Sequence, residues 1–401
     1  MNDMTPLATS ASREELEALR DVMRDFGKNE IRPRIRDLEL AGEFPREIYR
    51  QLGELGAYGT MIPENMGGSG MGFEALAIVS EELAYAYPPL SAGMNLQAAT
   101  VPLTIRNWGT PEQIEKYVAK LISAEILGCN GMSEPDGGTD FLGAMRTVAV
   151  RDGDDYIING TKMWITNANV ADVAIIYCKT DPKAKHKGVS AFLVPTDTPG
   201  FAASRVKCRV LGNLMPTNGL TFTDMRVPAS CMLGAEGEGF KVAMTAMDFG
   251  RLTVAARSLG LTRACLDASL EYADLRTAFG EKIGSFQMIK HQLADMVVEV
   301  AAATELVYKA ARMYDAGDIA TRESSIAKYY VGEVCNRAAQ ATAEIFGGYA
   351  FSDELPISIY LNFAKLWQTG EGSANLQRIL IADDALGWKL MDRHAQKVRN
   401  A

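Results

Sequence analysis

A glutamate near the end of the chain is the residue best placed to do chemistry. Glu371 lies between Gly370 and Gly372 and is followed by Ser373. Because glycine has no side chain, a ligand can approach both the carboxyl group and the backbone N–H groups beside it. A carboxylate that is open in this way can act as a general base. The same stretch also fits a turn that caps a helix, because serine is favoured just before a first helical turn.

Two further clusters carry groups that suit a planar ligand. The first, Asn130–Asp140, combines glycines with hydroxyl side chains, which leaves O–H and backbone N–H donors for an anionic or carbonyl-rich molecule. In the second, Lys162–Asn167, strand alternation places Trp164 and Thr166 on one face, an aromatic surface beside a hydroxyl. Taken singly, a solvated turn and a core tryptophan explain these clusters at least as well.

Apolar spacing predicts helices at both ends of the chain and strands between them. Ser12 and Glu15 form a capping box before an amphipathic helix that Pro33 interrupts. Long helical patterns in the last third predict a four-helix bundle. The fold class is therefore mainly α with a central β-domain of barrel or sandwich type, and the predicted domains are 1–127 (helical), 128–236 (β) and 237–401 (bundle). The expected strands include 172–179, 188–194, 203–211 and 220–225, and the expected bundle helices are 240–274, 286–315, 321–346 and 375–391.

Composition argues against several classes of function. The chain has 41 Lys and Arg residues against 50 Asp and Glu residues, a net charge of −9, and no basic run with interleaved aromatics, so we expect no nucleic-acid partner. Three histidines and six scattered cysteines lack metal-ligand spacing, so we expect no metal site and reduced thiols. No apolar run approaches the ~18 residues of a membrane span, and the N-terminus lacks a signal-peptide pattern. We therefore expect a soluble, cytoplasmic protein.

Four segments, taken together and in this order, resemble signatures of the acyl-CoA dehydrogenase family. Met132–Asp140 is similar to the first signature of that family, and Lys162–Asn167 matches its Trp-Ile-Thr-Asn strand. Arg276–Gly280, followed by Phe286 and Gln287, resembles the Arg-x-x-Phe-Gly…Phe-Gln element. Glu344–Tyr349 resembles a Gln-x-x-Gly-Gly-x-Gly element, with Glu344 in place of Gln. The likeness extends over nearly the whole chain.

The resemblance implies an FAD-dependent enzyme whose cofactor lies between the β-domain and the bundle. Glu371 would be the catalytic residue. The implied contacts to the flavin ring are Met132, Ser133, Trp164 and Thr166. The implied contacts to the rest of the cofactor, several of them to an FAD in an adjacent subunit, are Arg276, Phe279, Gln287, Glu344, Gly347, Gly348, Ser373 and Asn375. The implied substrate contacts are Thr139, Asp248, Arg251 and Gly372.

The reaction implied by the resemblance is α,β-dehydrogenation of an acyl-CoA thioester in fatty acid or organic acid degradation. Glu371 would remove the proton from the substrate Cα, and flavin N5 would accept the hydride from Cβ. Some relatives carry the glutamate on the long helix, just before the arginine that lines the substrate site, but that position is Gly250 here. The implied partners are acyl-CoA, an electron-transferring flavoprotein as electron acceptor, and further copies of the chain in a homotetramer or dimer.

The acyl group is left open by the sequence. Gly370 stands where straight-chain enzymes often have an aromatic residue, which predicts space for a branched or cyclic acyl group. A glutaryl group needs a cation for its distal carboxylate, and residues 90–95, where an arginine is expected, contain none. The alternatives are therefore a glutaryl-CoA dehydrogenase, a dehydrogenase of alicyclic or aromatic acid pathways, and an acyl-CoA oxidase. A non-catalytic acyl-CoA-binding protein is also conceivable, but Glu371 argues against it.

Overall fold

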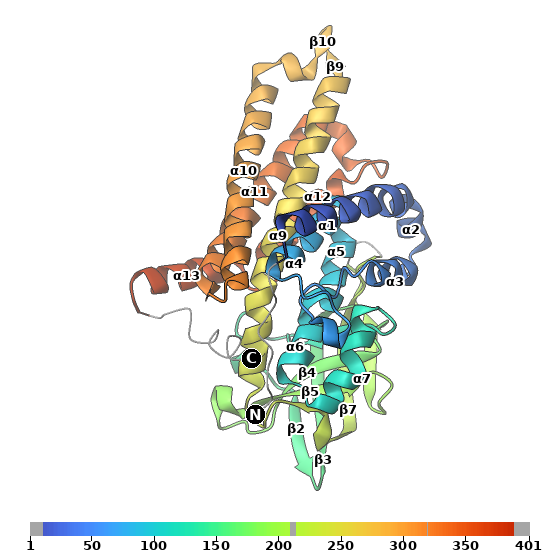
Figure 1. The fold of residues 1–401 in the computed structure, drawn as a ribbon, viewed down its shortest axis with the longest axis vertical. Helices are drawn as coiled ribbons and strands as arrows, with labels where there is room; N and C mark the ends of the chain where they lie inside the picture. The colour runs from blue at the N-terminus through green and yellow to red at the C-terminus, as the bar shows by residue number, and fades with distance from the viewer. Residues whose placement is uncertain (1–10, 209–213, 319, 389–401) are drawn as a thin grey trace.

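A long helix connects the two ends of the molecule. The computed structural model describes residues 11–208, 214–318 and 320–388. Helix α9 (Gly239–Leu275) starts beside the β-sheet and runs to the far end of a helical bundle (Figure 1). The N-terminal helices pack along its middle, so that helices, sheet and bundle share its surface. This arrangement confirms the predicted fold class, whereas the domain boundaries at residues 127 and 236 stay a prediction.

The N-terminal part is helical, as predicted. Its first helix begins at the expected capping box, in which the Ser12 N–H donates to Glu15 Oε2 (2.8 Å) and the Glu15 N–H donates to Ser12 Oγ (3.3 Å). The helices of this part are α1 (Arg13–Phe26), α2 (Ile35–Ala41), α3 (Arg46–Glu54), α4 (Phe73–Ala86), α5 (Pro88–Asn95), α6 (Val101–Trp108) and α7 (Pro111–Ile122).

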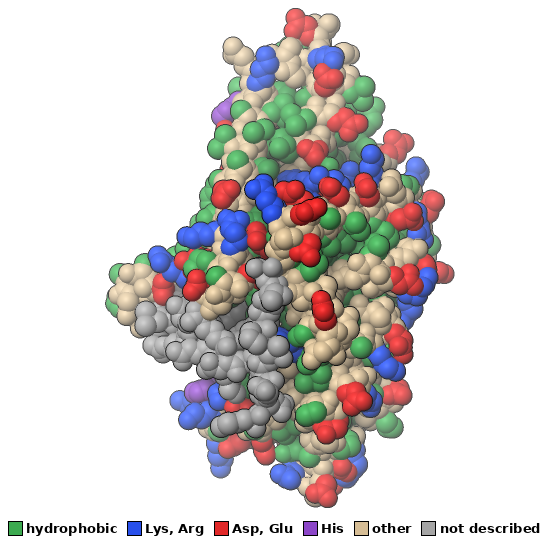
Figure 2. Space-filling model, viewed as in Figure 1, with side chains coloured by type: hydrophobic (Ala, Val, Ile, Leu, Met, Phe, Trp, Pro, Cys, Tyr) green, Lys and Arg blue, Asp and Glu red, His purple; other side chains and the backbone are tan. Residues whose placement is uncertain are grey.

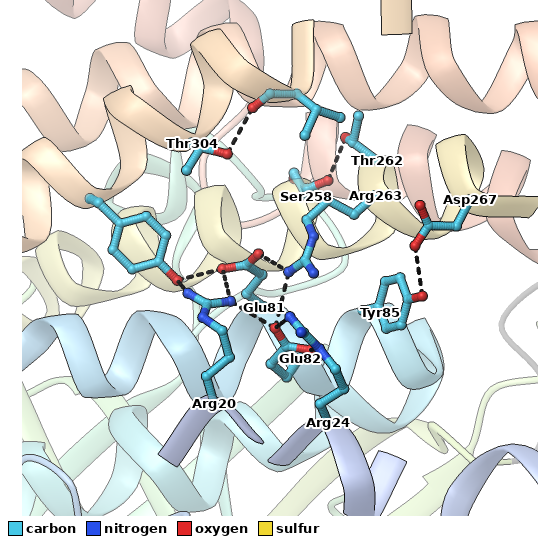
Figure 3. Close-up of polar contacts among 12 residues, drawn as sticks. Arg20, Arg24, Glu81, Glu82, Tyr85, Ser258, Thr262, Arg263, Asp267 and Thr304 are labelled. Atoms are coloured by element: carbon cyan, nitrogen blue, oxygen red, sulfur yellow. Dashed lines mark hydrogen bonds and ion pairs between the residues drawn. The ribbon is translucent and has the colours of Figure 1, made fainter. Parts of the chain in front are cut away.

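Helix α4 is buried on almost every side, and it carries two adjacent buried glutamates, Glu81 and Glu82. Side chains from three other helices converge on them (Figure 3). Two buried carboxylates would be costly without partners, so ion pairs with α1 and α9 compensate their charge, and a hydrogen bond from Tyr308 ties α10 to α4 as well. The partners are Arg20 and Arg24 of α1, Arg263 of α9 and Tyr308 of α10.

The central part is one mixed sheet, with strand order β6-β7-β3-β2-β4-β5-β8 and β1 paired to β4. Three of the expected strands lie within one to three residues of β4, β5 and β7. The fourth, 203–211, overlaps β6 only at its start, and residues 209–211 lie outside the described residues. The elements are β1 (Gly128–Gly131), α8 (Phe141–Ala144), β2 (Val148–Asp152), β3 (Asp155–Thr166), β4 (Val173–Lys179), β5 (Val189–Pro195), β6 (Phe201–Arg205), β7 (Thr217–Pro228) and β8 (Met232–Leu233).

The C-terminal part is a bundle whose fourth helix differs from the predicted one. Helices α9, α10 (Gln287–Asp315) and α11 (Thr321–Phe346) agree with the prediction within two residues. Besides α10, helix α12 (Ile357–Thr369) packs against both α9 and α11, and this fourth helix was not predicted. The predicted helix 375–391 corresponds to α13 (Ala374–Ala385), which packs against α11. The prediction was wrong for residues 386–388, which form a turn, and residues 389–391 lie outside the described residues. A short hairpin, β9 (Thr277–Ala278) and β10 (Glu281–Lys282), joins α9 to α10.

Within the described ranges, every helix is too short or too polar to cross a membrane.

Candidate active site

The loop between α12 and α13 presents Glu371. Helix α12 closes with a hydrogen bond from the Gly370 N–H to Leu366 O (2.8 Å), and α13 begins with Ser373 Oγ accepting from the Leu376 N–H (3.2 Å). Gly372 between them has φ 86°, a left-handed conformation that glycine adopts without strain. The helix-cap interpretation of this stretch is therefore correct, and it leaves the Glu371 side chain free for another task.

The carboxylate of Glu371 lies against a glycine of α9. A methyl group built on Gly250 would lie 2.0 Å from Glu371 Oε2, so no larger residue fits at position 250 without moving the carboxylate. The Glu371 side chain is 36% exposed. The backbone N–H of Glu371 has no hydrogen-bond acceptor within the described part of the chain. Both groups are thus available to a ligand.

The other carboxylate oxygen pairs with an arginine that sequence reasoning missed. Arg257 Nη2 lies 3.3 Å from Glu371 Oε1, and the Arg257 side chain is 4% exposed. Its Nε donates to Thr253 O (3.2 Å), and its guanidinium faces the ring of Trp367 at 5.8 Å. Burial lowers the pKa of Arg257, an effect that the Glu371 charge counters. Its position two helical turns after Gly250 is the signal that could have revealed it.

A buried lysine holds the same loop. Lys328 of α11 donates to the carbonyl oxygens of Gln368 (3.3 Å) and Gly372, on either side of Glu371. Burial lowers the pKa of Lys328 to about 8, against the opposing effect of the Glu371 charge. The loop is therefore positioned by hydrogen bonds to its backbone, and these leave the carboxylate of Glu371 open.

Met132 and Ser133 follow β1 and lie beside β3, where the Met163 N–H donates to Ser133 O (2.9 Å). Directly behind them, Lys162 and Glu134 form a fully buried ion pair of 2.8 Å. Burial raises the pKa of Glu134, but the Lys162 charge and the hydrogen bonds that Glu134 accepts outweigh this effect and hold the pKa below its ordinary value. The pair fastens the loop after β1 to the neighbouring strand.

Trp164 departs from ordinary strand geometry. A β-bulge between Lys162 and Ile165 interrupts the alternation of β3, and Trp164 adopts φ 65°. Its side chain is 57% exposed, whereas Ile165 is buried and Thr166 is half-buried. A large aromatic residue in a left-handed conformation is strained, and such strain is concentrated at functional sites. Trp164 is therefore not the core residue that a strand position would suggest.

The predicted substrate residues lie on three segments. Gly372 adjoins Glu371, and Arg251 is buried on α9 next to Gly250. Asp248 belongs to α9, but its side chain lies outside the described part of the structure. Thr139 is exposed in the loop before α8, which is attached to the β-sheet.

Six predicted cofactor residues lie at the far end of the bundle, away from the sheet (Figure 1). Phe279, at the tip of the β9–β10 hairpin, is 98% exposed and has φ 53°. Arg276 faces the ring of Tyr349 at 6.0 Å. The structure thus separates the predicted flavin contacts from these bundle residues within one chain. The other predicted cofactor residues at this end are Gln287, Glu344 and the Gly347–Gly348 turn. Gln287 is the first residue of α10, and Glu344 accepts a hydrogen bond from Gln292 Nε2 (2.6 Å). Ser373 and the exposed Asn375 lie instead beside Glu371.

Family models for the N-terminal, middle and C-terminal domains of acyl-CoA dehydrogenases match residues 13–125, 129–225 and 237–386. The chain belongs to the acyl-CoA dehydrogenase family. Its relatives in this family are oxidoreductases, and so is this chain.

Individual relatives resemble the chain over nearly its full length. It is 38% identical to a glutaryl-CoA dehydrogenase of Desulfococcus multivorans, over 94% of this chain and 98% of that protein. It is 33% identical to a mitochondrial short-chain specific acyl-CoA dehydrogenase of Bos taurus, over 92% of this chain and 89% of that protein. A solved complex of a glutaryl-CoA dehydrogenase with glutaryl-CoA has a TM-score of 0.92 at 37% identity, covering 96% of this chain and 98% of that one. FAD is the cofactor of this family.

Proposed function

We propose that this protein dehydrogenates an acyl-CoA thioester between Cα and Cβ, with Glu371 as the base that removes the Cα proton. The observation that carries the proposal is the position of the Glu371 carboxylate, open to ligand and set on an ordered loop. Its free backbone N–H can donate to the thioester oxygen, where negative charge develops as the proton leaves. FAD, when bound, supplies the hydride acceptor for Cβ.

The residues of the β-domain fit an isoalloxazine ring. Trp164 is exposed and strained beside Thr166, as a wall for a planar ligand would be. Asn130 Oδ1, close in sequence to Met132 and Ser133, is buried and has no hydrogen-bond partner within the described residues, which leaves an acceptor for a ligand donor. Met132, Ser133, Trp164 and Thr166 would hold the flavin ring.

The separation of the predicted cofactor contacts supports an assembly of several copies. Because Arg276 and Phe279 lie at the opposite end of the molecule from the sheet, they would reach the FAD of a neighbouring subunit. Hydrophobic side chains gather on this end of the bundle (Figure 2). The exposed hydrophobic residues of these segments are Leu275, Phe279, Met288, Tyr349 and Phe351, each more than half exposed. We assign a homotetramer or dimer as the active form, in which two subunits complete each FAD site.

Gly370, the residue before the base, bears on the size of the acyl group. A methyl group built on Gly370 would meet only Leu366 O, at 3.7 Å, so the residue before the base leaves room for a branched or cyclic acyl group. An electron-transferring flavoprotein would accept the electrons that the reduced flavin holds after dehydrogenation.

The six free cysteines fit a reducing compartment such as the cytoplasm. Oxidation of a panel of acyl-CoA thioesters with an artificial electron acceptor identifies the preferred chain.

Substitution of the base tests the function directly. Glu371→Gln should retain FAD and the folded structure but lower kcat by at least about 100-fold, because a positioned general base contributes roughly 10²–10⁴-fold. Flavin absorbance per chain and turnover with the artificial acceptor are the measurements. Glu354→Gln, at an exposed loop position, is the control and should leave turnover unchanged. Near-native turnover by Glu371→Gln would refute the assignment of the base.

A further inference from the structure

Two buried cations surround the single carboxylate of the loop. Arg257 is paired with Glu371, while within the described residues Lys328 donates to backbone carbonyl oxygens alone. Glu371 is the acid whose charge acts on both of them. Buried charges are ordinarily compensated one for one by opposite charges. Among the described side chains in contact with this loop, Arg257 and Lys328 are thus two buried cations against the one carboxylate of Glu371, which favours an anionic ligand group.

The guanidinium of Arg257 lies close to where the acyl chain must pass. Reacting atoms in a bound complex are about 3–3.5 Å apart, so the substrate Cα would lie about that far from Glu371. Arg257 Nη2 is 3.3 Å from the same carboxylate. With the separation between the two carboxylate oxygens added, the two distances place the guanidinium within roughly 9 Å of Cα. With carbon–carbon bonds of about 1.5 Å and a hydrogen bond of about 2.9 Å, a carboxylate whose carbon is three bonds beyond Cα reaches the guanidinium.

Proton transfer changes the charge balance around Arg257. When Glu371 takes the Cα proton it becomes neutral, and Arg257 loses the carboxylate with which it is paired. A buried arginine without a counter-charge is strongly unfavourable, so a substrate with an alkyl chain would raise the energy of this step. An acyl chain that ends in a carboxylate would keep Arg257 paired throughout the reaction.

We propose that Arg257 binds a carboxylate at the far end of the acyl chain, so that the substrate is a short dicarboxylic acid joined to CoA through one carboxyl group. The inference rests on the proposed dehydrogenation. Residues 90–95 of α5 contain no arginine that could bind such a carboxylate. Arg257 provides this cation from α9 instead, two turns after Gly250. Arg257 is thus a residue that determines specificity, in addition to its contact with the base.

Two thioesters of equal carbon number isolate the effect of the carboxylate. Glutaryl-CoA and pentanoyl-CoA are compared with the wild-type holoenzyme, Arg257→Met and Arg257→Lys. The wild type should prefer glutaryl-CoA in kcat/KM by at least about 100-fold, because a site built to bind a polar group rejects the analogue that lacks it. Arg257→Met should abolish this preference, and Arg257→Lys should restore part of it. Arg322 is an exposed arginine on a different helix, α11, and the control variant Arg322→Met should keep the wild-type preference.

Binding is measured separately from turnover. In calorimetric titrations, the Glu371→Gln holoenzyme should bind glutaryl-CoA more tightly than it binds pentanoyl-CoA. This difference in affinity should vanish in the double variant Glu371→Gln, Arg257→Met. If Arg257→Met lowers kcat/KM for both thioesters equally, Arg257 only orients Glu371 and the inference is overturned. A wild-type preference for pentanoyl-CoA overturns it as well, with dehydrogenation intact. If the wild type oxidises no acyl-CoA of any class, the proposed function itself fails and the inference falls with it.

Discussion

Gly250 and Glu371 come from different elements, yet each restricts what the other can be. The carboxylate occupies the volume that a side chain at position 250 would fill. A base on the long helix and a base on the loop are therefore alternatives for the same space. This exclusion is a physical reason why the chain carries glycine before Arg251 and glutamate at position 371.

Gly250→Ala should displace the base without unfolding the protein. The added methyl group would lie 2.0 Å from Oε2, and a flexible carboxylate moves more readily than a helix backbone. We expect kcat to fall by about 10-fold or more, since a displacement of about 1 Å can cost ~100-fold. The melting temperature should stay constant or rise slightly, because alanine favours a helix over glycine by up to about 1 kcal/mol.

Gly332→Ala on α11 is the matched control for this substitution. Its methyl group would meet Gln368 Cγ at 3.8 Å, an ordinary contact, so turnover should be unchanged. Full kcat in Gly250→Ala would show that the carboxylate in the active enzyme lies elsewhere.

At this scale, sequence patterns predicted candidates but not their contacts. Glu371 and Gly250 could be named from motif positions, and the structure brings them together. Arg257 and Lys328 were missed because each meets the loop across a long separation, 114 residues for Arg257 and 44 for the Lys328–Gly372 contact. A single sequence carries no record of such pairs. The bulge that exposes Trp164 was likewise invisible, because alternation assumes an unbroken ladder.

At the scale of elements, the ion-pair network on α4 should be essential to stability. Glu82 is fully buried and accepts from Arg20, Arg24 and Arg263. Glu82→Gln would leave Arg24 without its counter-charge and Arg20 and Arg263 paired with Glu81 alone, so we expect unfolding to be easier by about 3–5 kcal/mol, the usual effect of breaking a buried pair. Thermal or urea unfolding measures the loss. Glu17→Gln, which breaks an exposed pair with Arg13, should cost under about 1 kcal/mol.

The effect of Glu82→Gln should depend on pH. Burial raises the pKa of Glu82, but the bonds and charges of Arg24 and Arg263 outweigh this effect and hold the pKa below its ordinary value of 4.5. An acid with a lowered folded-state pKa contributes stability above its unfolded-state value and loses it as the pH falls. The difference between wild type and variant should therefore be full at pH 7 and shrink below about pH 4.5. A difference independent of pH would show that the Glu82 charge is not what stabilises α4.

Helices with strong periodicity were predicted well and short apolar ones were not. Helices α10 and α11 combine length with a clear polar face, and their predicted bounds agree within one residue. Helix α12 was not predicted, because its sequence mixes β-branched and aromatic residues over a few turns between Pro356 and Gly370. Such a pattern fits a strand or a loop equally well. Its burial against α9 and α11 determines the helix, and that is tertiary information.

At the scale of the whole molecule, the exposed end of the bundle predicts that assembly and cofactor retention are coupled. Phe279 is almost fully exposed in a left-handed conformation on the β9–β10 hairpin, with only an edge-on ring contact to Phe286 at 6.2 Å, a costly arrangement for a large aromatic side chain. Burial of the ring against a neighbouring subunit would offset that cost. If the neighbour also contributes the flavin contacts of its β-domain, the same residue supports both the interface and the FAD site.

Phe279→Asn tests this coupling, because asparagine tolerates the left-handed conformation and removes the aromatic ring without new backbone strain. We expect subunit association to weaken by at least about 30-fold, since an aromatic residue at the centre of an interface commonly contributes about 2 kcal/mol. Bound FAD per chain should fall in the same concentration range as the assembly dissociates. Sedimentation equilibrium and flavin absorbance measure both quantities on one sample, with Leu40→Asn on α2, an exposed apolar residue away from the bundle end, as the control. If the variant loses FAD while fully assembled, Phe279 contacts the cofactor but does not support the interface. If the variant dissociates and retains FAD, one chain suffices to hold the cofactor, and the proposal of a two-subunit FAD site is wrong.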